Sequence, residues 1–324
     1  MLDAESYTSW VMAVYTQLSA NDIQEIVGAY GLTAVRYEPI ETGASNSNYL
    51  LYTLHGRYIL TLFDELNQAG VNKLGELLLL LAANKFPTTR LLGPIKGGTN
   101  IIYNGKPVMI KRYIPGQIRR NFNEHMLRQA GAALAQLHQI PAPDFLSGKV
   151  PYGVEPFSQV RDQDIDREYA YWLVERFPDL EQQIQQDLPR GFIHGDLFYD
   201  NILFVGQQLN GLLDFECALH HYKVFDLAMG IVGLCGDLRG SLGQARPLLD
   251  GYQQIRQLEE KEKEALQLFI EYAAVTVSCW RFWKYHIELS IPKKAGVHWQ
   301  MVNIAKEVRD VPPVQFLEIM FGVC

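Results

Sequence analysis

Three polar residues near the middle of the chain have the types and spacing that phosphoryl transfer requires. Asp196 is followed by Asn201 five residues later and by Asp214 a further thirteen residues along. One carboxylate can face an acceptor hydroxyl, while an amide oxygen and a second carboxylate can hold the magnesium that neutralises nucleotide phosphates. The pattern predicts a small-molecule kinase site in which Asp196, Asn201 and Asp214 are catalytic and Asn201 and Asp214 bind the metal.

The alternative is that these residues only form turns, as Asp and Asn beside glycine often do. Apolar runs at 191–193, 202–205 and 209–213 bracket them and read as short strands. Carboxylates gathered at the ends of buried strands cost free energy to desolvate, so their clustering favours a functional site. We expect His194 to fix the loop by hydrogen bonding, because Asp196 already covers the role of base. Asp226 is expected to cap a helix, to clamp the catalytic loop, or to do both.

The first third of the chain reads as strands around one helix. Strands are expected at 35–40, 49–54, 58–63, 94–103 and 107–114, with a helix at 72–84 and a hairpin turn at Asn104-Gly105. A loop of small and polar residues lies between the first two strands, where backbone N–H groups could approach phosphates. Its residues expected at the nucleotide are Gly43, Ser45, Asn46, Ser47 and Asn48.

The remainder reads as helical, with helices expected at 123–138, 164–177, 245–256, 259–288 and 299–308. This division predicts an α+β protein with two lobes. Residues 1–112 would form a small antiparallel β-sheet lobe that binds nucleotide, and residues 113–324 a mostly helical lobe that binds the acceptor.

Candidate acceptor contacts fall in two places in the second lobe. Glu216, His220 and Tyr222 follow Asp214 closely, while Trp280 and Arg281 lie on one helix downstream. Glu216 could pair with an amino group, and Arg281 or Lys284 could bind a carboxylate. Core packing remains an alternative for the tryptophan.

Bulk composition narrows the class of protein and its partners. The 324 residues carry a net charge of −7, which argues against a dedicated nucleic-acid binder. Four widely spaced cysteines predict neither a zinc site nor a disulfide framework. The longest apolar stretch, 77–83, is too short for a membrane span, and the start of the chain lacks a signal-peptide pattern, so we expect a cytoplasmic protein acting on a small hydroxyl acceptor.

Several strings resemble the aminoglycoside phosphotransferase and choline kinase superfamily: H-G-D-L-F-Y-D-N-I-L-F from residue 194, L-L-D-F-E from 212, F-D-L-A from 225 and L-A-Q-L-H from 134. The resemblance implies a protein-kinase-like two-lobe fold that uses ATP and Mg²⁺, with the adenine against 109–114, including Tyr113. Other strings look like the homoserine kinase branch: M-A-V-Y-T from 12, G-A-S-N-S-N-Y from 43, Y-I-L-T-L-F from 58 and L-P-R-G from 188. This implies phosphorylation of homoserine for threonine synthesis; choline, ethanolamine, an aminoglycoside or a sugar is the alternative acceptor.

The chain departs from the family pattern at two places. Kinase folds usually carry a lysine on the third strand to hold phosphates, and Thr61 occupies that position here, as it does in the homoserine kinase branch. Lys111 could substitute, or could be a solvated edge-strand charge, and a nucleotide-binding pseudokinase is the alternative that the missing lysine supports. The segment 215–221 also differs from the family, which leaves the acceptor open.

Overall fold

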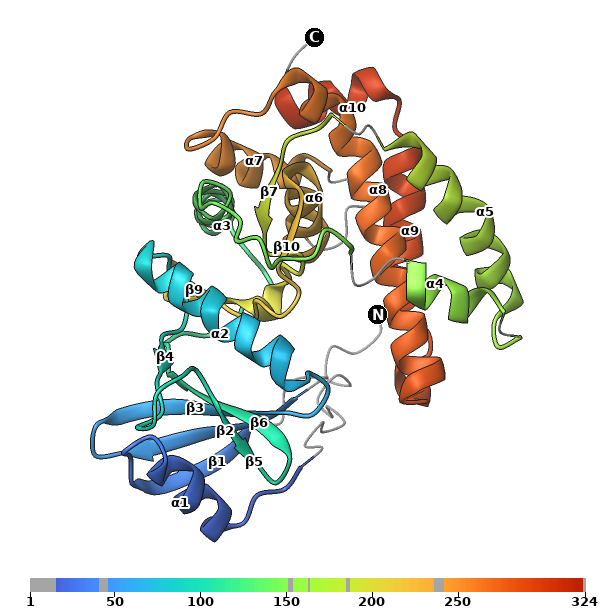
Figure 1. Ribbon diagram of the computed structural model, residues 1–324. Coiled ribbons are helices and arrows are strands. Elements are labelled where there is room, and N and C mark those ends of the chain that lie inside the picture. The colour runs from blue at the N-terminus through green and yellow to red at the C-terminus, as the bar shows by residue number, and fades with distance from the viewer. Residues whose placement is uncertain are drawn as a thin grey trace. The chain divides into compact units, whose positions relative to one another are not determined.

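The computed structural model describes residues 16–40, 46–150, 154–162, 164–184, 187–235 and 242–322. The chain divides into two compact units, Met1–Pro115 and Gly116–Cys324. In Figure 1 the first unit runs from blue to green and the second from green to red. Gly43 and Ser45, which were expected at the nucleotide, lie outside the described residues.

The first unit is built on one antiparallel sheet. Its strands are β1 (Ala34–Ile40), β2 (Asn46–Thr53), β3 (Gly56–Phe63), β4 (Leu91–Leu92), β5 (Ile101–Tyr103) and β6 (Lys106–Arg112). They are ordered β1-β2-β3-β6-β4, and β5 pairs with β6. Helix α1 (Ala20–Gly28) begins at Ser19 with a capping box, and α2 (Gln68–Ala83) begins at Asn67, whose side chain accepts from the N–H of Gly70.

The core of this unit follows from the alternation of side chains along the strands. Tyr58, Leu60 and Leu62 of β3 are buried on one face, where they join Ile23 and Ile26 of α1 in one apolar cluster. The hairpin between β5 and β6 turns at Asn104-Gly105, both at positive φ, as the sequence predicts. The strand expected at 94–103 is confined to its last three residues, because Gly97 and Gly98 adopt positive φ in a turn.

The second unit is mostly helical. Its α-helices are α3 (Glu124–Leu137), α4 (Val154–Arg161), α5 (Arg167–Gln183), α6 (Lys223–Leu234), α7 (Arg246–Gln253), α8 (Glu260–Phe282), α9 (His298–Arg309) and α10 (Pro313–Phe321). Single-turn elements occur at Tyr199–Asn201, Leu242–Ala245 and Pro292–Lys294, and a π-helical turn at Trp283–Glu288 extends α8. Two short hairpin ladders pair β7 (Arg190–Ile193) with β10 (Leu219–Tyr222), and β8 (Ile202–Val205) with β9 (Gln208–Leu212).

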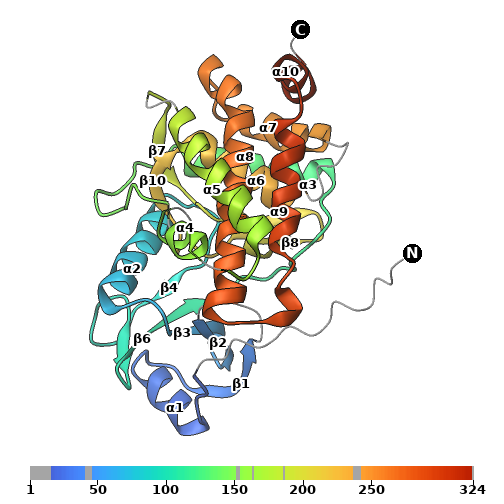
Figure 2. The same ribbon diagram turned by 90° about the vertical axis from the view of Figure 1, so that its right-hand side faces the viewer.

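Helix α6 is the centre of this unit. Every residue from Val224 to Leu234 is buried, which is the pattern of a helix surrounded by protein on all sides. It contacts α3 on one side and α8 on the other, and α8 runs alongside α9 (Figures 1 and 2). No helix within the described ranges combines the length and apolar character needed to cross a membrane. The predicted α+β class is confirmed, with the sheet in the first unit and most helices in the second.

Candidate active site

The pairing of β7 with β10 brings together the two segments that carry the predicted catalytic residues. Ile193, the last residue of β7, pairs with Leu219 of β10, so the loop after β7 and the loop before β10 leave the ladder at the same end. Two hydrogen bonds then join these loops. The N–H of Leu213 donates to the carbonyl of Asn201 at 2.8 Å, and His194 Nε2 lies 2.8 Å from the carbonyl of Leu213.

Asn201 is held directly against Asp196. Its Nδ2 donates to the backbone carbonyl of Asp196 at 2.8 Å and to a carboxylate oxygen of Asp196 at 3.0 Å. This fixes the orientation of the amide, so its Oδ1 points away from Asp196, and no described residue donates a hydrogen bond to it. Asn201 therefore presents a free oxygen next to the predicted catalytic carboxylate.

Asp214 is exposed and has a backbone φ of 59°, in the left-handed region that non-glycine residues seldom adopt. Such strain persists where the surrounding structure fixes it, and it is concentrated at functional sites. The N–H of Glu216 lies 3.4 Å from Asp214 Oδ1. Among the described residues there is no cluster of three or more His, Cys, Asp or Glu side chains able to hold a metal alone. Magnesium usually takes one or two protein oxygens beside waters and phosphates, and Asn201 with Asp214 fits that donor set.

A buried carboxylate holds the catalytic loop, which is the loop that follows β7 and carries Asp196. Asp226, in α6, is fully buried and accepts hydrogen bonds at 2.8 Å from the backbone N–H groups of His194 and Gly195. His138, the residue that follows α3, lies 3.0 Å away through Nε2. Burial by itself raises the pKa of Asp226, but these donors outweigh it and the pKa is lowered on balance. Of the two roles expected for Asp226, the structure shows the clamp, because the N–H groups that its carboxylate binds belong to the catalytic loop.

His194 has the structural role that we expected. Its ring joins the two loops, because Nδ1 accepts from the N–H of Asp196 at 3.2 Å while Nε2 faces the carbonyl of Leu213. The ring also lies against Phe215, with centroids 4.7 Å apart. His194 therefore shapes the loop around Asp196 and is fully buried itself.

Arg281 lies beside the catalytic loop. Its guanidinium carbon is 5.9 Å from the centroid of Phe198, and its charge interacts with Asp196. Nη1 donates to the carbonyl of Val297 and to Gln300 Oε1 at 3.2 and 3.1 Å. Burial lowers the pKa of Arg281. Trp280, the preceding residue, meets the ring of Tyr285 edge-on at the π-helical turn, with centroids 6.1 Å apart.

The other expected acceptor residues spread along β10. Glu216 is half-buried and lies next to Asp214, whereas β10 carries His220 and Tyr222 progressively away from the catalytic loop. Tyr222 is buried against Phe269, and the guanidinium of Arg190 lies 4.1 Å above its ring.

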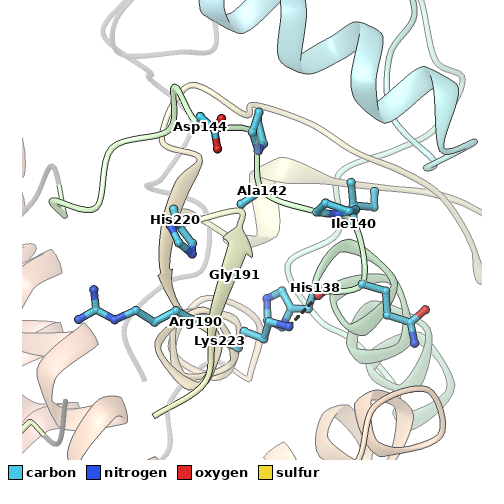
Figure 3. Close-up of a pocket in the computed structure, with 11 residues that line it drawn as sticks. His138, Ile140, Ala142, Asp144, Arg190, Gly191, His220 and Lys223 are labelled. Carbon is cyan, nitrogen blue, oxygen red and sulfur yellow. Dashed lines mark hydrogen bonds between the residues drawn. The ribbon is translucent and has the colours of Figure 1, made fainter. Parts of the chain in front are cut away.

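His220 lines a cavity of about 440 Å³ formed by residues 138–144, β7, β10 and the start of α6. Figure 3 shows Lys223 reaching the carbonyl of His138 in this cavity, while the guanidinium of Arg190 points away from the other labelled residues. Burial lowers the pKa of Lys223. Asp144 also lines the cavity, so its walls carry charges of both signs.

In the first unit, the expected nucleotide residues hold one another. Thr61 Oγ1 donates to Asn48 Oδ1 at 2.7 Å across the β2–β3 pair, and Asn48 Nδ2 lies 3.4 Å from the carbonyl of Asn46. Ser47 is fully buried, and its hydroxyl donates to Asp64 at 2.7 Å. Thr61, which stands where kinase folds usually carry a lysine, is thus part of a cross-strand hydrogen bond.

Lys111 and Tyr113 lie at the end of β6 and just beyond it. Lys111 is half-buried and pairs with Leu91 and Ile59 through the backbone. The guanidinium of Arg57 lies 4.0 Å above the ring of Tyr113. Lys106, which the sequence did not single out, donates to Asp64 at 2.6 Å at the end of the sheet where β2 begins. There was little reason in the sequence to select this residue, because a lysine directly after an Asn-Gly turn is usually a solvent-exposed surface charge.

These two units, with a sheet in one and a clamped Asp-Asn-Asp site in the other, are those of a kinase-like phosphotransferase. The pattern of the phosphotransferase enzyme family, known as APH, matches residues 36–264. The homoserine kinase of Rhizobium meliloti (strain 1021) is 30% identical over 281 residues, which cover 82% of this chain and 84% of that protein. The homoserine kinase of Nitrobacter winogradskyi is 32% identical over 277 residues, with coverage of 82% and 84%. The chain belongs to the APH phosphotransferase family, and it is a kinase that acts on an alcohol group.

Solved structures support the fold. A microcompartment-associated aminopropanol kinase superposes with a TM-score of 0.73 at 15% identity, covering 93% of this chain and 100% of that one. The spectinomycin phosphotransferase APH(9)-Ia superposes with a TM-score of 0.67 at 15% identity, covering 95% and 99%. At this identity the likeness concerns the fold alone, and it confirms the kinase-like architecture that the motifs predicted.

Proposed function

We propose that this phosphotransferase transfers the γ-phosphoryl group of Mg²⁺-ATP to the hydroxyl of homoserine. Residues 1–112 are the nucleotide-binding lobe of this proposal and residues 113–324 the catalytic and acceptor-binding lobe. The family membership supports the reaction type. The observation that carries the choice of acceptor is Arg281, a half-buried cation beside the catalytic loop that forms no ion pair with any described carboxylate.

Asp196 faces the acceptor hydroxyl and takes up or orients its proton. Asn201 fits this arrangement, because its amide group anchors the Asp196 carboxylate through Nδ2 while its Oδ1 stays available. Asn201 Oδ1 and the Asp214 carboxylate are the oxygens that would hold magnesium. When bound, the metal ion neutralises charge on the nucleotide phosphates. The strained backbone of Asp214 keeps its carboxylate outside the core, where a cation can reach it.

In the first unit the hydroxyls of Ser47 and Thr61 are used internally, so their part is to hold β2 against its neighbours. The nucleotide contacts fall to the loop that contains Gly43, Ser45 and Asn46, to Asn48, and to the segment with Lys111 and Tyr113. Small residues in such a loop let backbone N–H groups approach phosphate oxygens. Thr61 in place of the usual lysine leaves the phosphate charge to backbone donors, a lysine elsewhere and the metal ion.

Arg281 discriminates between the candidate acceptors. Its Nη1 is occupied, but no described residue accepts a hydrogen bond from Nε or Nη2, and no described carboxylate forms an ion pair with it. A half-buried guanidinium with donors left over can bind an anion through charge-assisted hydrogen bonds. Homoserine has a carboxylate to offer, whereas choline, ethanolamine and aminoglycosides are cationic and sugars are neutral. Glu216, beside Asp214, is placed for the amino group.

The test is ADP release from Mg²⁺-ATP against homoserine, choline, ethanolamine, serine, sugars and aminoglycosides. We expect turnover with homoserine well above the rest, and its loss in Asp196→Asn. Arg281→Met should raise the KM for homoserine about 10- to 100-fold, the effect of one or two lost hydrogen bonds to a charged group, with little change in the KM for ATP. Arg309→Met, on the exposed side of α9, is the matched control.

Two results would count against the proposal. Efficient turnover of a cationic or neutral acceptor would keep the phosphotransferase and replace homoserine. An unchanged KM for homoserine in Arg281→Met would show that the acceptor carboxylate binds elsewhere.

A further inference from the structure

A chain of buried polar side chains continues from Asp226 beyond the catalytic loop. It passes through His138 to Tyr252, which is the last but one residue of α7, then to Arg256 and to Glu262 in the first turn of α8. Asp226, Tyr252 and Glu262 are fully buried, and His138 is 3% exposed. The clamp on the catalytic loop is thus connected to helices remote from it in sequence.

The direction of each hydrogen bond can be assigned from one end. The ionised carboxylate of Asp226 can only accept, so the His138 nitrogen 3.0 Å away, Nε2, must carry a proton. Burial lowers the pKa of His138, which favours the neutral ring, and the other nitrogen of a neutral imidazole is an acceptor. The hydroxyl of Tyr252, 2.7 Å from Nδ1, must therefore donate to it.

The hydrogen bonds at the other end of this series of side chains agree with the assignment. Tyr252 uses its single proton on His138, so its oxygen must accept, and Arg256 Nη1 donates to it at 3.1 Å. Glu262 fixes the guanidinium of Arg256 with two hydrogen bonds, at 3.0 and 2.8 Å. Glu262 also accepts from the N–H of Glu259 at 3.0 Å, which closes the capping box of α8. Arg256 Nη1 has two hydrogens and serves both Tyr252 and Glu262, so the donors and acceptors match along the whole series.

Two glycines allow α3 and α7 to approach closely enough for this contact. A Cβ on Gly131 would lie well under 3.0 Å from the carbonyl of Leu248, and a Cβ on Gly251 equally close to the carbonyl of Arg128. The helices lie side by side (Figure 1). His138 follows the last residue of α3 and contacts Tyr252 near the end of α7. The close packing sets the distance that a single hydrogen bond between the two residues spans.

We propose that Tyr252, Arg256 and Glu262 are positioning residues for phosphoryl transfer: they orient the His138 ring so that its Nε2–H supports Asp226, which holds the catalytic loop. The inference rests on the proposed function, since its consequence is the placement of Asp196. Removing the Tyr252 hydroxyl leaves Nδ1 of His138 without its donor and the ring free to turn. The N–H groups of His194 and Gly195 then lose a well-oriented acceptor, and Asp196, which follows them, is less well placed.

The test compares Tyr252→Phe with Tyr272→Phe. Tyr272 is a buried tyrosine of α8 whose hydroxyl has no hydrogen-bond partner among the described residues, so it controls for the loss of a tyrosine hydroxyl alone. In ¹⁵N-histidine spectra at pH 8, with His138 assigned from His138→Asn, the Nδ1 signal of Tyr252→Phe should move toward that of a ring nitrogen without a donor. Amide exchange at Gly195 should be roughly tenfold faster and kcat about tenfold lower at unchanged KM values, as expected for one hydrogen bond of ordinary strength.

Glu262→Gln is the second variant, because it keeps an acceptor for Glu259 but removes the charge that orients Arg256. It should change the same quantities in the same direction by about threefold. Tyr252→Phe with an unchanged Nδ1 signal, or with a changed signal but unaltered Gly195 exchange and kcat, would overturn the inference. If the unmodified protein phosphorylates none of the acceptors, the proposed function fails. The Nδ1 signal and the amide exchange at Gly195 still decide whether Tyr252 orients His138.

Discussion

Gly195 is the position at which the catalytic loop is most sensitive to a single added methyl group. Its φ is +80°, and a Cβ placed on it would lie well under 3.0 Å from the backbone carbonyl oxygen of Cys217. Its N–H is also one of the two that Asp226 holds. Gly195→Ala therefore introduces backbone strain and an overlap with an atom that cannot rotate away.

The two costs can be estimated separately. An alanine in the left-handed region costs about 1–2 kcal/mol. Non-bonded carbon atoms prefer separations of about 3.5–4.0 Å, so relief of the overlap requires a backbone shift of about 1 Å. Asp196 is the next residue and moves with the loop, and a displacement of about 1 Å at a reacting group can reduce the rate about 100-fold. We expect Gly195→Ala to lose about 2–3 kcal/mol of stability and roughly two orders of magnitude in kcat.

Gly206, in the turn between β8 and β9, separates strain from overlap. Its φ is +61°, but no atom lies within 4 Å of a Cβ built on it. Gly206→Ala should lose about 1 kcal/mol in urea unfolding and keep its kcat for ADP release. The difference between the two variants then measures the contact with Cys217.

A kcat for Gly195→Ala within about threefold of the Gly206→Ala value, at pH and substrate levels where both are folded, would refute the reasoning. It would show that the loop can shift near Gly195 without moving Asp196, and that the clamp by Asp226 is not what positions this carboxylate.

Three further changes test other parts of the second unit. Asp226→Asn replaces an acceptor oxygen by an amide NH₂ group that faces N–H donors. The free energy of unfolding, measured in urea, should fall by about 3–4 kcal/mol, and kcat should fall with it. Gly251→Ala should separate α3 from α7 and lower the thermal midpoint by several degrees, which calorimetry measures, because the added carbon meets a backbone carbonyl. Burial lowers the pKa of His221 to about 4, with Arg190 adding to the effect. The unfolded chain therefore binds the proton first, and the contribution of His221, ~3 kcal/mol, is complete above pH 6.5 and is lost as the pH falls toward 4. His221→Phe should flatten that part of the stability profile by about one proton, and an unchanged slope would contradict this assignment.

Local sequence was enough to predict that the segments with Asp196, Asn201 and Asp214 lie close together. Asp196, Asn201 and Asp214 are set off by apolar strands, and the β8–β9 hairpin returns the chain to its starting point within a few residues. The turn at Asn104-Gly105 was predictable for the same reason, because both residues favour positive φ. The strand expected at 94–103 was wrong over its first part, because Gly97 and Gly98 form a turn there at positive φ.

Contacts between distant segments could not be predicted. His138 and Tyr252 are separated by 114 residues, and their hydrogen bond depends on the close approach of two helices. Gly131 and Gly251 were the available signal, but a glycine within a helix does not say which neighbour it admits. His220 and Tyr222 show a different limit of sequence spacing: both are near Asp214 in sequence, but an extended strand advances about 3.3 Å per residue and carries them away from it. Their contact with the acceptor stays a prediction.

Charged side chains of the second unit fall into two groups: those whose partners lie within the protein, and one that has donors left for a ligand. Asp226 is fully buried with three donors around it, and Glu262 and Arg256 neutralise each other. Each of these groups has what it needs within the protein, so each acts on the fold and on the loop that it holds. Arg281 is half-buried, and although the charges of Asp200 and Asp196 act on it, no described carboxylate forms an ion pair with it. Its remaining donors beside the loop that carries Asp196 suit an acceptor that has an anion to offer. Asp226 therefore belongs to the scaffold, whereas Arg281 stays the proposed contact for an acceptor carboxylate, which the KM for homoserine of Arg281→Met tests.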